Sequence, residues 1–159
     1  MNATHLHLIL NHIPVLGVVF GLGFLAFALW RRNETVQRIA LGLLLIAALF
    51  AVPTFLTGEP AEDGVQGLPG ISKPLIEQHE KVAGVALGGT LVVGALALGG
   101  LIWFRSQRLM PAWFGLVMLT GALIVSGLMG WTASLGGQVR HTEIRSGAPG
   151  PSQSDNDHD

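Results

Sequence analysis

Four long apolar stretches dominate the sequence, and each is close to the length that a helix needs to cross a lipid bilayer. A membrane-spanning helix takes about 20 mostly apolar residues. The stretches cover roughly residues 6–30, 39–56, 82–104 and 113–135. Only 12% of the 159 residues are charged, whereas about a quarter of a soluble chain is charged. The pattern predicts an all-α fold, an integral membrane four-helix bundle in a lipid bilayer.

The spans predict one membrane domain over residues 1–142 and a polar, acidic tail over residues 143–159. The composition of the tail is typical of disorder. No basic residue precedes the first apolar stretch, so we expect this stretch to be a retained span and not a cleaved signal peptide. Two glycine pairs, Gly17 with Gly21 and Gly84 with Gly88, have the spacing that lets helix backbones approach closely.

The composition excludes several kinds of function. The chain has no cysteine, which rules out disulfides, iron–sulfur clusters, thiolate zinc sites and covalently attached haem. Histidine and carboxylate remain as strong metal ligands. A net charge of −1 argues against a nucleic-acid partner, since no basic patch is available to neutralise phosphates. No known catalytic motif is present, so the sequence does not indicate an enzyme.

Basic residues predict the orientation in the membrane. Two short connections between spans hold five of the nine basic residues, whereas the other four are spread over longer segments on the opposite side. The five are Arg31, Arg32, Arg38, Arg105 and Arg108, and the four are Lys73, Lys81, Arg140 and Arg145. By the positive-inside rule the short connections are cytoplasmic. We therefore expect a multi-pass protein of the bacterial inner membrane with its N- and C-termini on the outer, periplasmic side.

With this topology every histidine falls on the outer side, namely His5, His7, His12, His79, His141 and His158. His12 lies about 10 Å further along the first helix than His5, at about 1.5 Å per residue. That depth is costly for an ionisable group, which usually indicates a function. His141 follows the pair Gly136-Gly137, which we expect to let the chain turn back over the bundle.

We expect Pro14 to disturb the regular geometry of the first helix. On a regular helix His7 and His12 point roughly 140° apart, at about 100° per residue. Pro14 removes a backbone donor and clashes with the preceding turn. A kink there allows both histidines to face one site, and the carbonyl freed near Leu10 then needs another partner. Four helices with histidines at one end have the geometry that holds a haem or a metal ion, and Gly84 and Gly88 make room for a porphyrin.

Simpler interpretations stay open for each residue alone. His5, His7 and His79 can be interfacial histidines that hydrogen-bond to lipid headgroups. His12 can bond to a neighbouring helix, for example near Thr132, and His141 can be a solvated loop residue. Acids in a Gly/Pro-containing loop are usually solvated, although carboxylates also bind cations; these acids are Glu59, Glu62 and Asp63.

A first helix with the pattern H-x4-H-x-P, from His7 to Pro14, resembles a family of uncharacterised bacterial four-helix membrane proteins. Thr57-Gly58 after the second span, His79 at the third and Gly136-Gly137 before His141 extend the resemblance over residues 5–142. The resemblance implies a four-helix membrane fold and no established activity. Its histidine positions fall on His7, His12, His79 and His141. This chain has an additional His5, Ile13 where the family has an aromatic residue, and Thr142 where it has glycine.

The sequence predicts an electron-transfer subunit with a haem b, for which His12 and His79 are the preferred axial pair. His7 and His141 are then alternative ligands or contacts of the haem propionates. A periplasmic cytochrome, quinol or a larger respiratory complex is the expected partner. The first alternative is a copper or zinc binding or transport protein that uses the four histidines as ligands. The second is a structural or assembly subunit without a cofactor.

Overall fold

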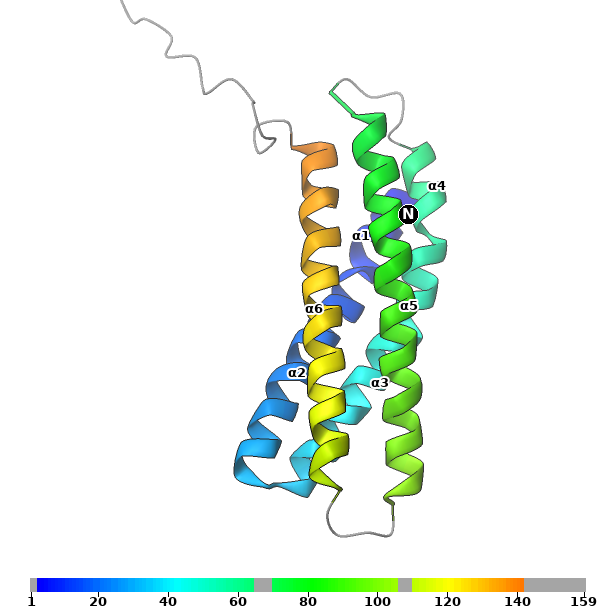
Figure 1. The fold of residues 1–159 in the computed structure, drawn as a ribbon. Helices are drawn as coiled ribbons and strands as arrows, with labels where there is room; N and C mark the ends of the chain where they lie inside the picture. Colours follow the sequence, from blue (N-terminus) through cyan, green and yellow to red (C-terminus); the bar gives the residue numbers. More distant parts are fainter. Residues whose placement is uncertain (1–2, 65–69, 106–109, 142–159) are drawn as a thin grey trace, which may run out of the picture.

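The computed structural model describes residues 3–64, 70–105 and 110–141, and every element over these residues is a helix (Figure 1). The elements are α1 (Ala3–Leu10), α2 (His12–Arg31), α3 (Glu34–Leu56), α4 (Gly58–Asp63), α5 (Lys73–Trp103) and α6 (Ala112–Arg140). The helical fold predicted from the sequence is confirmed.

Four helices of the described chain are long and apolar enough to cross a membrane. One of them is α1 and α2 together, which run as a single segment from Ala3 to Arg31 with an interruption at Asn11. The others are α3, α5 and residues Ala112–Val139 of α6. These properties support a multi-pass membrane protein, as the four apolar stretches predicted.

The helices extend beyond the apolar stretches because polar residues continue them. Helix α3 begins five residues before Ile39, since the side chain of Asn33 accepts a hydrogen bond from the Val36 amide (3.1 Å) and caps the first turn. Helix α5 begins at Lys73, so His79 lies inside it. Helix α6 continues through Gly136-Gly137 to Arg140. The expectation that this glycine pair turns the chain back is therefore wrong.

Small residues set the closest helix contacts. A Cβ atom built on Gly94 of α5 would lie 2.2 Å from the Cβ of Ala48 in α3. Equivalent atoms on Gly17 and Gly21 of α2 would lie within 2.9 Å of side chains of α3. These contacts confirm close packing through Gly17 and Gly21. The largest fully buried side chains lie on α2, α3, α5 and α6, and they are Val18, Leu25, Leu41, Leu44, Thr90, Met118 and Val125.

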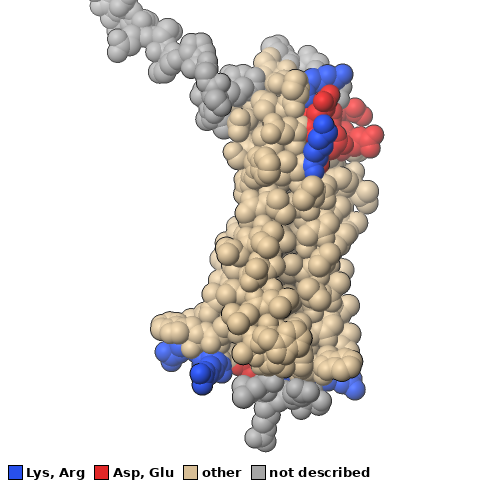
Figure 2. All heavy atoms as spheres, viewed as in Figure 1, with Lys and Arg blue, Asp and Glu red and all other residues tan. Residues whose placement is uncertain are grey.

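The two ends of the bundle differ in chemistry (Figure 2). We call the end formed by α1, α4, the start of α5 and the end of α6 the histidine end, and Figure 1 shows these segments together. We call the end formed by the α2–α3 turn, the end of α5 and the start of α6 the arginine end. In the view of Figure 2 most of the acidic side chains gather at the histidine end, beside side chains of Lys or Arg.

At the arginine end, Arg38 connects α3 to the end of α5. Its guanidinium donates to the Phe104 carbonyl (2.7 Å) and pairs with Glu34 one turn earlier in α3. Trp30 and Trp103 are 76% and 77% exposed at this end, and Trp113 is also exposed. Exposed tryptophans of this kind are typical of a membrane–water interface.

Candidate cofactor site at the histidine end

The interruption between α1 and α2 follows from Pro14, which cannot donate a hydrogen bond to the carbonyl of Leu10. The hydroxyl of Thr54, in α3, lies 3.3 Å from that oxygen and supplies a donor. The expectation that the freed carbonyl needs another partner is confirmed. This contact joins the α1–α2 junction to the last turn of α3.

His7 projects from α1 toward the same turn of α3 and is half-buried. Its Nδ1 lies 3.0 Å from the Thr54 carbonyl oxygen and 3.1 Å from the Thr57 hydroxyl oxygen. A carbonyl oxygen only accepts hydrogen bonds, so the neutral ring carries its proton on Nδ1. The Nε2 of His7 consequently has a free lone pair.

His79 is held in the same manner by a different helix. It is half-buried, and its Nδ1 lies 2.9 Å from the Thr132 carbonyl oxygen in α6. Its ring packs on Gly136, where an added Cβ would lie 3.1 Å from the ring carbon Cε1. The absence of a side chain at Gly136 therefore lets the imidazole lie against α6. The Nε2 of His79 also has a free lone pair.

His7 lies against the end of α3, and His79 lies against the last turns of α6. The structure thus brings two half-buried imidazoles from different helices to the same end of the bundle. In both rings the Nδ1–H is donated to a backbone carbonyl. Histidines that bind metals almost always donate the non-ligating ring N–H in this way, because the hydrogen bond sets the tautomer and the ring orientation.

His12 has a different environment. Its Nδ1 donates to the carbonyl of Leu8 in α1, one turn earlier in the same membrane-spanning segment (2.7 Å). Its side chain is exposed. The buried face of α2 carries Pro14, Val18 and Gly21, and His12 lies about 200° around the helix from Pro14 at about 100° per residue. Within the described residues no hydrogen bond connects His12 to His7 or His79.

The remaining predicted residues lie around the same end. His141 follows α6, and its amide donates to the Gly137 carbonyl (2.9 Å) while its side chain is exposed. His5 is exposed on α1. His158 and the tail over residues 143–159 lie outside the described residues. Of the loop acids, Glu59 and Asp63 are exposed on α4, and Glu62 is half-buried.

These side chains do not form a ready-made metal site. Across residues 3–64, 70–105 and 110–141, no group of three or more histidine, aspartate or glutamate side chains is placed to hold a metal ion. Within this part of the chain, the half-buried imidazoles at the histidine end are those of His7 and His79.

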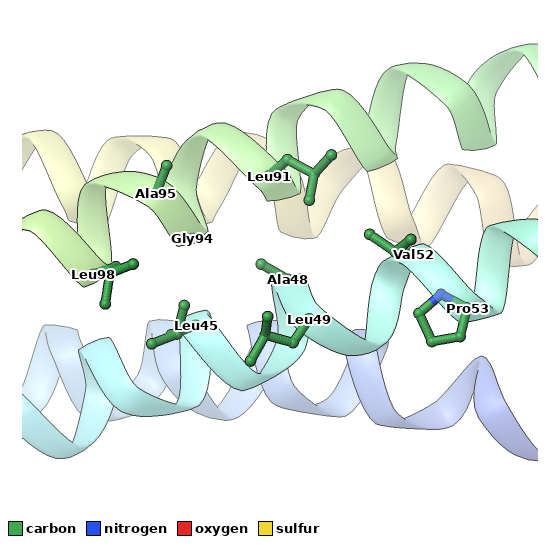
Figure 3. A pocket seen from close by; sticks show the side chains of 9 residues that line it. All are labelled: Leu45, Ala48, Leu49, Val52, Pro53, Leu91, Gly94, Ala95 and Leu98. Carbon is green, nitrogen blue, oxygen red and sulfur yellow. The ribbon is translucent and has the colours of Figure 1, made fainter.

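A groove between α3 and α5 is lined by none of these histidines (Figure 3). Its volume is about 410 Å³, and none of its nine lining residues has a polar side chain. Figure 3 shows Leu45 and Leu49 of α3 facing Leu91 and Leu98 of α5 along the groove. An apolar groove on a membrane helix pair suits hydrocarbon chains and offers no ligand for a cofactor.

Sequence reasoning did not predict that Thr54, Thr57 and Gly136 contact the histidines, and it suggested Thr132 as a partner of His12, whereas Thr132 contacts His79. The sequence did contain a signal for Thr54. Pro14 leaves the Leu10 carbonyl without a donor, and Thr54 carries a hydroxyl near the end of the second span. Comparisons of the chain with protein-family models, curated proteins and solved structures found no match.

Proposed function

We propose that the protein is a membrane-embedded electron-transfer subunit that binds a b-type haem between His7 and His79. One observation carries the proposal. Two half-buried imidazoles on different helices each have the Nδ1–H bound to a backbone carbonyl, which leaves both Nε2 atoms available as ligands. Haem iron in a helical bundle takes axial imidazoles from facing helices in this way.

The number of converging ligands favours haem over a bare ion. A structural zinc site takes four protein ligands and a catalytic one takes three, whereas a porphyrin supplies four nitrogens and needs two axial side chains from the protein. Over the described residues, no group of three or more potential ligands is placed to hold a metal ion, and the histidine end presents the half-buried His7 and His79. Once bound, the haem would supply one-electron redox chemistry, while the helices orient the two imidazoles.

The proposal replaces His12 by His7 in the preferred axial pair. His12 is exposed and bonded within its own membrane-spanning segment, whereas His7 is half-buried and bonded to the end of α3. Gly88 does not provide space for the ring, because it is exposed on α5 and a Cβ there would meet no atom within 4 Å.

We further propose that the protein lies in the bacterial inner membrane with the histidine end facing the periplasm. The arginine end carries the exposed Arg31, Arg32 and Arg105, and positive residues favour the cytoplasmic side. In this orientation the haem would exchange electrons with a periplasmic cytochrome or quinol, as part of a larger respiratory assembly.

The test is an absorption spectrum with elemental analysis of protein purified from its native membrane. We expect a low-spin b-type spectrum and one iron per porphyrin. His7→Ala and His79→Ala should each abolish the low-spin spectrum, because each removes an axial ligand, whereas His12→Ala should retain it.

Three results would overturn the proposal. A colourless protein with copper or zinc would support a metal-binding protein, and one without any metal would support a structural subunit. Loss of the spectrum in His12→Ala with retention in His7→Ala would restore the pair His12 and His79.

A further inference from the structure

The side chain of Thr57 contacts His7 directly, and this contact allows an inference that rests on the proposed function. We propose that Thr57 is a positioning residue for His7. Its hydroxyl oxygen, together with the Thr54 carbonyl, holds the Nδ1–H of His7, directs Nε2 toward the cofactor and increases the electron donation of the ring.

The end of α3 explains why acceptors are available at this point. The last carbonyls of a helix have no amide donor in the following turn, and Thr54 lies in the last turn of α3, which ends at Leu56. The Thr57 hydroxyl donates to the Thr54 carbonyl (2.8 Å). Its hydrogen is thereby engaged, so the same oxygen faces His7 Nδ1 (3.1 Å) as an acceptor.

The two threonines have separable roles. The single hydrogen of the Thr54 hydroxyl is shared between the carbonyls of Phe50 (2.8 Å) and Leu10 (3.3 Å) and supports the helix junction. Only the backbone of Thr54 contacts His7. The Thr57 side chain contacts the imidazole itself. A substitution of Thr57 therefore changes the environment of His7 without removing the donor to Leu10.

The chain contains a matched control for this substitution. Thr90 lies in the core of α5, and none of its hydrogen bonds joins it to a histidine. Its hydroxyl donates to the Ala86 carbonyl of its own helix (2.6 Å). Thr90→Val thus removes a hydroxyl of the same type and leaves the contacts of His7 and His79 in place.

We expect Thr57→Val to weaken haem binding roughly 10- to 100-fold, the range seen when a hydrogen-bond partner of a ligating histidine is removed. The midpoint potential should shift upward, because a less electron-donating imidazole stabilises oxidised iron less. Thr57→Ser should restore both values, since it keeps the hydroxyl. Thr90→Val should leave both close to those of the unchanged protein.

A second measurement does not depend on haem. In haem-free protein labelled with ¹⁵N-histidine, Thr57→Val should shift the ring nitrogen signals of His7, and Thr90→Val should leave them in place. Equal effects of the two variants on His7 would overturn the role of Thr57. If the protein never binds haem, the proposed function fails, and the ring signals still decide whether Thr57 positions His7.

Discussion

The Nδ1 atoms of His7, His12 and His79 each lie 2.7–3.0 Å from a backbone carbonyl oxygen. A hydrogen bond of the same type therefore sets the Nδ1–H tautomer at all three residues. What distinguishes them is the surrounding structure, because His7 and His79 are half-buried between helices and His12 is exposed. At the scale of single residues, burial and interhelical partners distinguish His7 and His79 from His12.

The contact between His79 and Gly136 gives a prediction at this scale. Gly136→Val should displace the imidazole from the Thr132 carbonyl, because the Cβ alone would already lie 3.1 Å from ring atom Cε1. We expect the low-spin haem spectrum to be lost while circular dichroism shows unchanged helix content. Gly127→Val is the control on the same helix, since a Cβ there meets nothing within 4 Å. An unchanged spectrum in Gly136→Val would contradict the proposed position of His79.

Pro14 leads to a hydrogen bond between the end of α1 and α3. Pro14 leaves the Leu10 carbonyl without its usual donor, and Thr54 supplies one from the neighbouring helix. The same turn of α3 accepts the His7 Nδ1–H. The last turn of α3 thus both supports the break between α1 and α2 and orients His7.

The contact of α3 with α5 depends on a glycine, and this gives a prediction at the scale of elements. Gly94→Ala should lower the free energy of unfolding by about 1–3 kcal/mol, because overpacking a close contact forces the helices apart; the new Cβ would overlap that of Ala48. Thermal unfolding in detergent measures the effect. Gly99→Ala, where the Cβ meets nothing within 4 Å, should cause no loss. Equal stability of both variants would disprove the close contact.

The whole molecule has a charge asymmetry along its long axis (Figure 2). Exposed arginines lie at one end, and the exposed acids Glu59 and Asp63 lie at the other, beside the histidines. Both ends of the described chain, Ala3 and His141, lie at the histidine end (Figure 1). Since an even number of spanning helices returns the chain to its starting side, this arrangement agrees with four spans.

The absence of cysteine from the sequence makes the proposed orientation directly testable. In intact cells with a permeabilised outer membrane, a maleimide that cannot cross the inner membrane should label Glu59→Cys and Asp63→Cys. It should label Thr35→Cys, which is exposed at the arginine end, only after the cells are lysed. The reverse labelling pattern would show that the histidine end faces the cytoplasm.

Much of the fold could be predicted because hydrophobicity acts locally along the chain. The four apolar stretches, the position of all described histidines at one end and the unsatisfied carbonyl near Leu10 were all predicted from the sequence. The helix ends were predicted less well. Polar residues such as Asn33 and those from Lys73 to Lys81 continue helices beyond the apolar stretches, and a glycine pair that normally permits a turn remains helical where His79 packs on it.

By itself, the sequence determined that the chain forms apolar helices and that its histidines gather at one end, since both follow from residue types and helix lengths. Only the tertiary structure decided that His7 and His79 converge while His12 remains exposed. The partners that orient these two rings, Thr54 and Thr132, lie 47 and 53 residues away in the chain. Such contacts depend on the rotation of each helix against its neighbours, which arises from packing between distant segments.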